Sequence, residues 1–100
     1  MKKEELIKSI LSKLDQQKPF LVDKYKVTSL GVFGSFARQE QTASSDLDLL
    51  VSFSEPPGLL TFLELENYLC ELLETKVDLV MRDSLKKRIG QRILKEVVPV

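Results

Sequence analysis

The spacing of apolar side chains in the first quarter of the chain predicts two consecutive helices. Apolar residues between Leu6 and Leu14 recur every three or four positions, so we expect an amphipathic helix over residues 3–15. Proline lacks a backbone N–H and does not fit the interior of a helix, but it is well suited to a first turn. Pro19 is therefore expected to open a separate short helix over residues 19–24.

Three later segments have the alternation or the β-branched content of strands. They cover residues 27–33, 46–53 and 76–81. The second is the clearest, because one set of side chains faces each way along it. Leu47, Leu49, Val51 and Phe53 point to one face, and Asp46, Asp48, Leu50 and Ser52 point to the other.

Helical spacing returns over residues 59–74, and Ser84 is expected to cap a last helix over residues 85–97. The order helix, strand, strand, helix, strand, helix predicts an α/β (α+β) fold with a small three-stranded mixed sheet. We expect the helices to pack on one face and the other face, which carries the aspartates, to stay open. Residues 1–100 are expected to form a single domain.

Composition removes several kinds of chemistry. The chain has no His and one Cys, which excludes Ser–His–Asp hydrolysis, His-ligated zinc, an intrachain disulfide and a thiolate metal cluster. No apolar run spans a membrane, and the start of the sequence does not resemble a secretory signal. The prediction is a cytoplasmic protein with no membrane partner.

The net charge of zero conceals a segregation of charge along the chain. Residues 1–38 hold eight basic and four acidic side chains, residues 39–81 hold one and nine, and residues 82–100 hold six and two. A solvated acidic surface and a cation site beside basic segments both explain this pattern, and charge alone does not choose between them.

Three aspartates form the candidate catalytic and metal-binding group. Asp46 and Asp48 are two positions apart on one strand, so their carboxylates emerge on the same face with Cα atoms roughly 7 Å apart. Asp78 lies between Val77 and Leu79 and faces away from both. If the two strands pair with aligned faces, all three carboxylates converge.

Converging carboxylates repel one another, and divalent cations would relieve that repulsion. Oxygen ligands suit Mg²⁺ or Mn²⁺, and two such ions hold the attacking and leaving oxygens of a phosphoryl displacement. Gly34 and Ser35 follow a strand directly, where a close backbone approach and a hydroxyl donor suit a phosphate group. Arg38 could add a cation to the same nucleotide-binding loop.

Three segments together resemble the minimal nucleotidyltransferases of the DNA polymerase beta-like nucleotidyltransferase superfamily. They are Gly-Ser-Phe-Ala-Arg at 34–38, Ser-Asp-Leu-Asp-Leu-Leu-Val at 45–51 and Val-Asp-Leu-Val at 77–80. The resemblance implies a nucleotidyltransferase-like fold over essentially the whole chain. It implies transfer of a nucleoside monophosphate from an NTP to a hydroxyl, with release of pyrophosphate.

The same resemblance assigns roles to the residues of these segments. Asp46 and Asp48 would bind two Mg²⁺ ions, and Asp78 would share one ion and help activate the acceptor hydroxyl. Gly34 and Ser35 would hold the triphosphate, with Arg38 as a helper. One position departs from the family pattern: Gln39 stands where the family usually has Gly. Because Gln takes a positive φ less readily than Gly, the loop over residues 39–44 is expected to be conformed differently.

Small members of this family resemble the antitoxins of two-gene toxin–antitoxin pairs, whose partner is a HEPN-domain toxin. The resemblance implies one of two mechanisms. In the first, the protein transfers AMP from ATP to a tyrosine of its partner. In the alternative, it neutralises its partner by binding alone, without catalysis. Because the three aspartates and the Gly-Ser pair are all present, we favour AMP transfer.

The basic residues of the last helix allow another interpretation, in which they contact nucleic acid or an acidic partner. These residues are Lys86, Lys87, Arg88, Arg92 and Lys95. The last nineteen residues hold no aromatic side chain on which a base could stack. We therefore expect a solvated helix face and no direct binding of nucleic acid.

Overall fold

The computed structural model describes residues 3–42, 44–85 and 87–100. Helices and strands follow one another along these ranges in an order close to the predicted one. The elements are α1 (Lys3–Tyr25), β1 (Val27–Phe33), β2 (Leu47–Phe53), α2 (Leu59–Leu73), β3 (Val77–Met81), the 3-10 helix η1 (Arg82–Ser84), α3 (Lys87–Glu96) and β4 (Val98–Pro99).

The strands form one mixed sheet in the order β3-β2-β1-β4. β2 runs antiparallel to β1 and parallel to β3, and helix α2 makes the long crossover that a parallel pair needs. The three predicted strands are confirmed within one residue at their ends. The prediction of three strands was wrong by one, because Val98 and Pro99 add the short antiparallel strand β4 to the free edge of β1.

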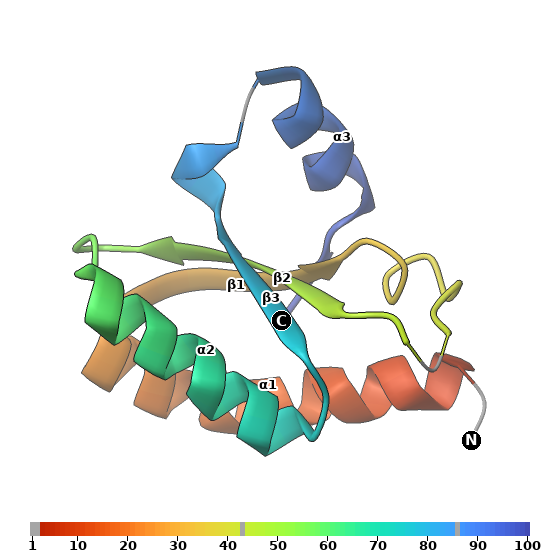
Figure 1. The fold of residues 1–100 in the computed structure, drawn as a ribbon, viewed down its shortest axis with the longest axis horizontal. Helices are drawn as coiled ribbons and strands as arrows, with labels where there is room; N and C mark the ends of the chain where they lie inside the picture. Colours follow the sequence, from red (N-terminus) through yellow and green to blue (C-terminus); the bar gives the residue numbers. More distant parts are fainter. Residues whose placement is uncertain (1–2, 43, 86) are drawn as a thin grey trace.

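The helices lie on both faces of the sheet, so the prediction that all pack on one face was wrong. In Figure 1, α1 and α2 lie below the sheet and α3 lies above it. Side chains of β2 that face α1 and α2, such as Leu47 and Leu49, are completely buried. Leu50 points to the opposite face and is also buried, beside Leu94 and Val97 at the end of α3. The face that carries the aspartates is therefore partly covered.

Helix α1 continues without a break through Pro19, which corrects the expectation of two helices. Proline removes one helical hydrogen bond and crowds the preceding turn. The apolar stripe nevertheless stays in phase across it, because Leu14 and Leu21 lie one on each side and are both fully buried. Burial of this continuous stripe offsets the local cost of proline. Lys26 alone, at a φ of 61°, then turns the chain into β1.

The last helix also differs from its prediction. The hydroxyl of Ser84 does not cap a helix but donates to the carbonyl oxygen of Met81, 2.7 Å away, within the 3-10 turn η1. Residue 86, inside the predicted helix, lies outside the described residues. Helix α3 ends at Glu96, one residue before the predicted end, because the chain then enters β4. None of the described helices combines the length and the apolar character that a membrane crossing requires.

Candidate active site

The register of β2 and β3 brings two aspartates side by side. Asp48 of β2 is the direct partner of Asp78 in the parallel ladder. Asp46 lies one residue before β2, and its carboxylate is 3.9 Å from the ammonium group of Lys76. The face predicted for Asp48 from strand alternation agrees with its position, because its neighbours Leu47 and Leu49 are buried on the other side.

Gly34 lies on the other side of Asp48, directly after the end of β1. Phe33, the last residue of β1, pairs with Asp48 across the antiparallel ladder, and Gly34 follows it with a φ of 74°. That φ lies in the left-handed region, which glycine adopts without a steric penalty. A side chain here would collide with the carboxylate of Asp48. Glycine therefore permits both the turn and the close approach of the backbone to Asp48.

The surroundings of Asp48 favour the protonated form of its carboxyl. Partial burial raises the pKa of Asp48 above its usual value, and the negative charges of Asp78, Asp46 and Glu96 raise it further. Arg38 acts in the opposite direction and lowers that pKa. A cation next to Asp48 would relieve this repulsion and favour the charged form of the carboxyl.

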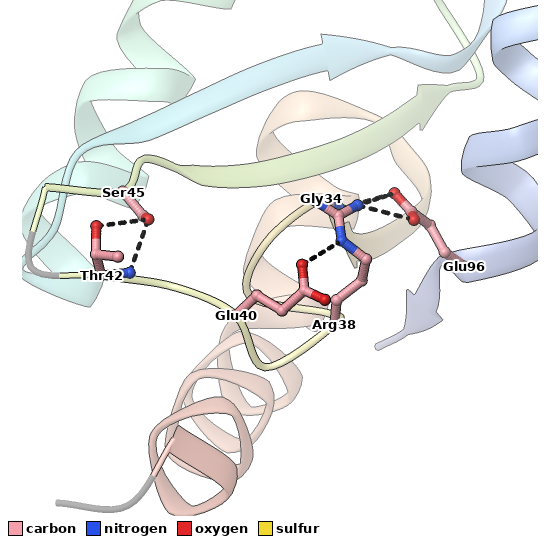
Figure 2. A network of polar contacts seen from close by, with 6 residues as sticks. All are labelled: Gly34, Arg38, Glu40, Thr42, Ser45 and Glu96. Carbon is pink, nitrogen blue, oxygen red and sulfur yellow. Dashed lines mark hydrogen bonds and ion pairs between the residues drawn. The ribbon is translucent and has the colours of Figure 1, made fainter.

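Glu96, at the end of α3, lies against the loop that follows β1 and was not predicted as a site residue (Figure 2). Its Oε1 accepts a hydrogen bond of 3.1 Å from the backbone N–H of Gly34. The guanidinium group of Arg38 donates from Nη1 to both oxygens of Glu96, at 3.0 and 3.3 Å. These hydrogen bonds, followed by the one with Glu40, raise the pKa of Arg38.

Arg38 also contacts a second carboxylate within its own loop. Its Nε donates to Glu40 across 3.1 Å, as Figure 2 shows. The hydroxyl of Ser35 has no hydrogen-bond partner in the described part of the chain, although Ser35 is half-buried. Its backbone carbonyl accepts from the N–H of Glu40, which holds residues 35–40 in tight turns. The loop thus presents a guanidinium group and a hydroxyl next to Gly34.

The loop after Arg38 takes the conformation that a glycine would allow. Gln39 adopts the left-handed conformation with a φ of 59°, so the expected departure from a glycine-like backbone is not found at this residue. Gln41 is buried, and its side-chain amide has no hydrogen-bond partner among the described residues. Near the end of the loop, the Ser45 hydroxyl accepts from the N–H of Thr42 at 2.9 Å (Figure 2). This bond fixes the backbone immediately before Asp46.

The donor set suits a hard cation that keeps part of its water shell. Over residues 3–42, 44–85 and 87–100, no three acidic or thiol side chains gather closely enough to hold a metal ion by themselves. Mg²⁺ in proteins is often bound by one or two carboxylates, with waters and substrate phosphates completing its shell. The pair Asp48 and Asp78, with Asp46 nearby, fits that mode of binding.

The basic residues of the last helix are described only in part. Lys86 and the side chains of Lys87 and Arg88 lie outside the described residues. Arg92 and Lys95 are exposed, as expected for a solvated helix face.

Comparison with known proteins agrees with this architecture. The nucleotidyltransferase domain family matches residues 14–100. The protein adenylyltransferase MntA of Thermococcus cleftensis is 48% identical over 94 residues, which cover 94% of this chain and 95% of MntA. A solved structure of a protein assigned to the minimal nucleotidyltransferases is 35% identical, with a TM-score of 0.77, and covers 100% of this chain and 97% of the other.

A more distant similarity concerns the fold alone. The crystal structure of the toxin–antitoxin complex MntA–HepT contains a chain that is 21% identical to this one, with a TM-score of 0.65. The match covers 89% of this chain and 69% of the other. The family match and the similarity to MntA extend over nearly the whole sequence and include the Gly-Ser and aspartate segments. The chain is a nucleotidyltransferase and belongs to the nucleotidyltransferase domain family that includes the protein adenylyltransferase MntA.

Proposed function

We propose that residues 1–100 act as one antitoxin domain that transfers AMP from ATP to a tyrosine hydroxyl of a HEPN-type toxin partner. In this reaction the acceptor oxygen forms a bond to the α-phosphorus, the bond from that phosphorus to the bridging oxygen breaks, and pyrophosphate leaves. The observation that carries the proposal is the pairing of Asp48 with Asp78 directly beside the backbone of Gly34. A group of carboxylates thereby lies next to a loop whose N–H and O–H groups can donate hydrogen bonds to phosphate oxygens.

The loop residues would bind and orient the triphosphate. Gly34 offers a backbone N–H and Ser35 a hydroxyl, and both suit phosphate oxygens. Arg38 is already placed next to Gly34 and could neutralise part of the negative charge. Because these donors belong to one tight loop fixed to the end of β1, they would hold the nucleotide in one orientation relative to Asp48.

The aspartates would hold divalent cations and the acceptor. We propose that Asp46 and Asp48 are ligands of two Mg²⁺ ions, with Mn²⁺ as an alternative, and that Asp78 shares one of them. When bound, such ions neutralise the charge of the triphosphate and stabilise the attacking and leaving oxygens. Asp78 is exposed at the edge strand, where an acceptor hydroxyl can approach it. It would help remove the proton of that hydroxyl as the new bond forms.

The relatives support the choice of nucleotide and acceptor. MntA of Thermococcus cleftensis is named a protein adenylyltransferase. Solved complexes with the same fold include a toxin–antitoxin pair with AMP-PNP and a tri-AMPylated HEPN toxin of Shewanella oneidensis with its MNT antitoxin. Because the proposed reaction uses ATP and a protein made in the same cell, we propose that the chain acts in the cytoplasm.

Intact mass spectrometry tests the proposal on the candidate toxin, the product of the gene adjacent to that of this protein. The toxin is incubated with this protein, ATP and Mg²⁺, and we expect its mass to rise by whole AMP units. Replacing Asp48 by Asn should slow that transfer at least about 10²-fold, since an interaction that stabilises charge in the transition state is lost. Asp15→Asn is the matched control: it removes one exposed carboxylate from α1 and should leave the rate unchanged.

Two results would contradict AMP transfer. One is a tight complex with the toxin but no mass gain, which would identify an antitoxin that acts by binding alone. The other is a folded Asp48→Asn variant that transfers AMP at the wild-type rate. EDTA in place of Mg²⁺ should abolish the mass gain, and restoring either Mg²⁺ or Mn²⁺ identifies the ion that supports the reaction.

A further inference from the structure

The carboxylate of Glu96 occupies the donors that a nucleotide phosphate would need. One of its oxygens accepts from the backbone N–H of Gly34 at 3.1 Å, and both accept from the guanidinium group of Arg38. A backbone N–H beside a guanidinium group is a typical binding arrangement for a phosphate oxygen. In this structure a side chain of the protein itself fills that arrangement (Figure 2).

A phosphate group and the Glu96 carboxylate exclude each other at this position. Each backbone N–H donates one strong hydrogen bond, so the N–H of Gly34 serves either Glu96 or the nucleotide. The Glu96 carboxylate is itself negatively charged, so it repels a triphosphate that approaches the same donors. Both the shared donor and the charge repulsion oppose nucleotide binding while Glu96 remains in place.

The fold holds Glu96 at this position. It is the last residue of α3, and β4 follows within two residues and pairs with β1. The partner of Val98 in that pairing is Val32, two residues before Gly34. The N–H of Val100 also donates to the carbonyl oxygen of Leu30 at 2.9 Å. The β1–β4 pairing therefore brings Glu96 to the phosphate loop, while its side chain, 29% exposed, can still rotate outward.

We propose that Glu96 is a built-in competitor of the nucleotide: its carboxylate closes the phosphate loop in the free protein and must leave Gly34 and Arg38 before ATP binds. This inference deepens the proposed function and rests on it. Glu96 then sets the affinity for ATP, because every binding event includes the loss of its charge-assisted hydrogen bonds.

Charge-neutral variants of two glutamates separate this role from a simple structural one. Glu96→Gln keeps the shape of the side chain but removes the charge. Glu40→Gln is the matched control, because Glu40 also pairs with Arg38, at 3.1 Å, but among the described residues it makes no hydrogen bond to Gly34. Binding of AMP-PNP with Mg²⁺ is measured by calorimetry at one fixed ionic strength for the wild-type protein and both variants.

We expect Glu96→Gln to bind AMP-PNP about tenfold more tightly than the wild type, since hydrogen bonds to charged groups are the strong ones that binding must break. Glu40→Gln should change the dissociation constant less than about twofold, as is usual for an exposed ion pair. Thermal melts provide a second measurement: without nucleotide, Glu96→Gln should melt at or below the wild-type temperature. With saturating AMP-PNP, its increase in melting temperature should exceed that of the wild type.

An NMR spectrum of the backbone amides reports directly on the hydrogen bond between Gly34 and Glu96. The chain has four glycines, so the Gly34 amide signal is readily assigned. It should shift on Glu96→Gln and on addition of AMP-PNP to the wild type, but not on Glu40→Gln. Equal or weaker nucleotide binding by a folded Glu96→Gln would overturn the inference and assign Glu96 to positioning Arg38. If the wild type and both variants all fail to bind AMP-PNP, the proposed function itself is wrong, and this inference with it.

Discussion

The two faces of the sheet are built on different principles. On the face covered by α1 and α2, β2 presents Leu47, Leu49 and Val51, each with 1% exposure or less, and the partly buried Phe53. On the face below α3, the same strand presents Asp48 and Leu50 beside a loop with left-handed residues. The first face is a continuous apolar core. The second combines carboxylates with a close approach of the backbone at Gly34.

The difference shows where this chain accepts destabilising features. Like charges in adjacent strands, such as those of Asp48 and Asp78, cost free energy. They are found on the face that we assign to chemistry, and the core on the opposite face supplies the stability that tolerates them.

Replacing two neighbouring leucines of β2 tests the contrast between the two faces, and it should have the largest effect on stability. Leu49→Ala should lower the free energy of unfolding by about 3 kcal/mol, because Leu49 is fully buried and its loss leaves a cavity. Leu50→Ala should cost about 2 kcal/mol, because Leu50 already lines a small hollow with Leu94 and Val97. Urea unfolding measures both. Equal losses would mean that the α3 face is packed as firmly as the core.

Two glycines test the strain at the site. Gly34→Ala should reduce AMP transfer about 10²-fold and stability by about 1–2 kcal/mol, because an added Cβ meets the Asp48 carboxylate at a positive φ. Gly58→Ala is the control: Gly58 has a φ of −68° and no atom within 4 Å of the added Cβ. Its rate and melting temperature should stay close to wild type. Wild-type transfer by Gly34→Ala would remove this loop from the site.

A smaller effect concerns the pH dependence of stability. Because the pKa of Asp48 is raised in the folded state, folding is favoured while Asp48 is protonated, and that contribution is lost as the pH rises through the raised pKa. Asp48→Asn should therefore raise the stability at pH 7 by about 0.5 kcal/mol, or about 2–4 °C in melting temperature, as like charges between strands are removed.

Below the usual pKa of an aspartate, 3.8, the wild-type side chain is neutral as well, and this advantage should disappear. Thermal melts of the wild type and of Asp48→Asn from pH 7 to pH 3 measure the difference in melting temperature. Asp15→Asn is the control for the loss of one surface charge. A stabilisation by Asp48→Asn that does not vary with pH would mean that repulsion at Asp48 is not its origin.

Alternation and β-branched content along single segments were enough to predict three of the four strands and the faces of Asp48 and Asp78. It was not enough where tertiary contacts override local preference. Pro19 remains inside α1 because the buried stripe on both sides of it outweighs the missing hydrogen bond. Residues 98–99 carry too short a pattern to indicate a strand, and they form β4 only because the edge of β1 is available.

The candidate site shows the same limit. Asp46, Asp48 and Gly34 stand out in the sequence because they lie close together at the ends of two consecutive strands. Glu96 is 62 residues from Gly34, and only the β1–β4 pairing brings it to the loop. Its one signal in the sequence is an acidic residue in a basic segment, which by itself indicates no role. Contacts made by the return of the chain to an earlier strand carry no local pattern.

The position of β3 in the sheet has a consequence for solubility. In the order β3-β2-β1-β4, the five-residue strand β3 is an edge strand, and Asp78 is its one charged side chain. Edge strands expose unpaired backbone groups that can join a sheet of another molecule, and a charge on such a strand opposes that association. Asp78 therefore opposes aggregation through an otherwise apolar edge strand. Solubility and the proposed role in AMP transfer both favour a carboxylate at this position.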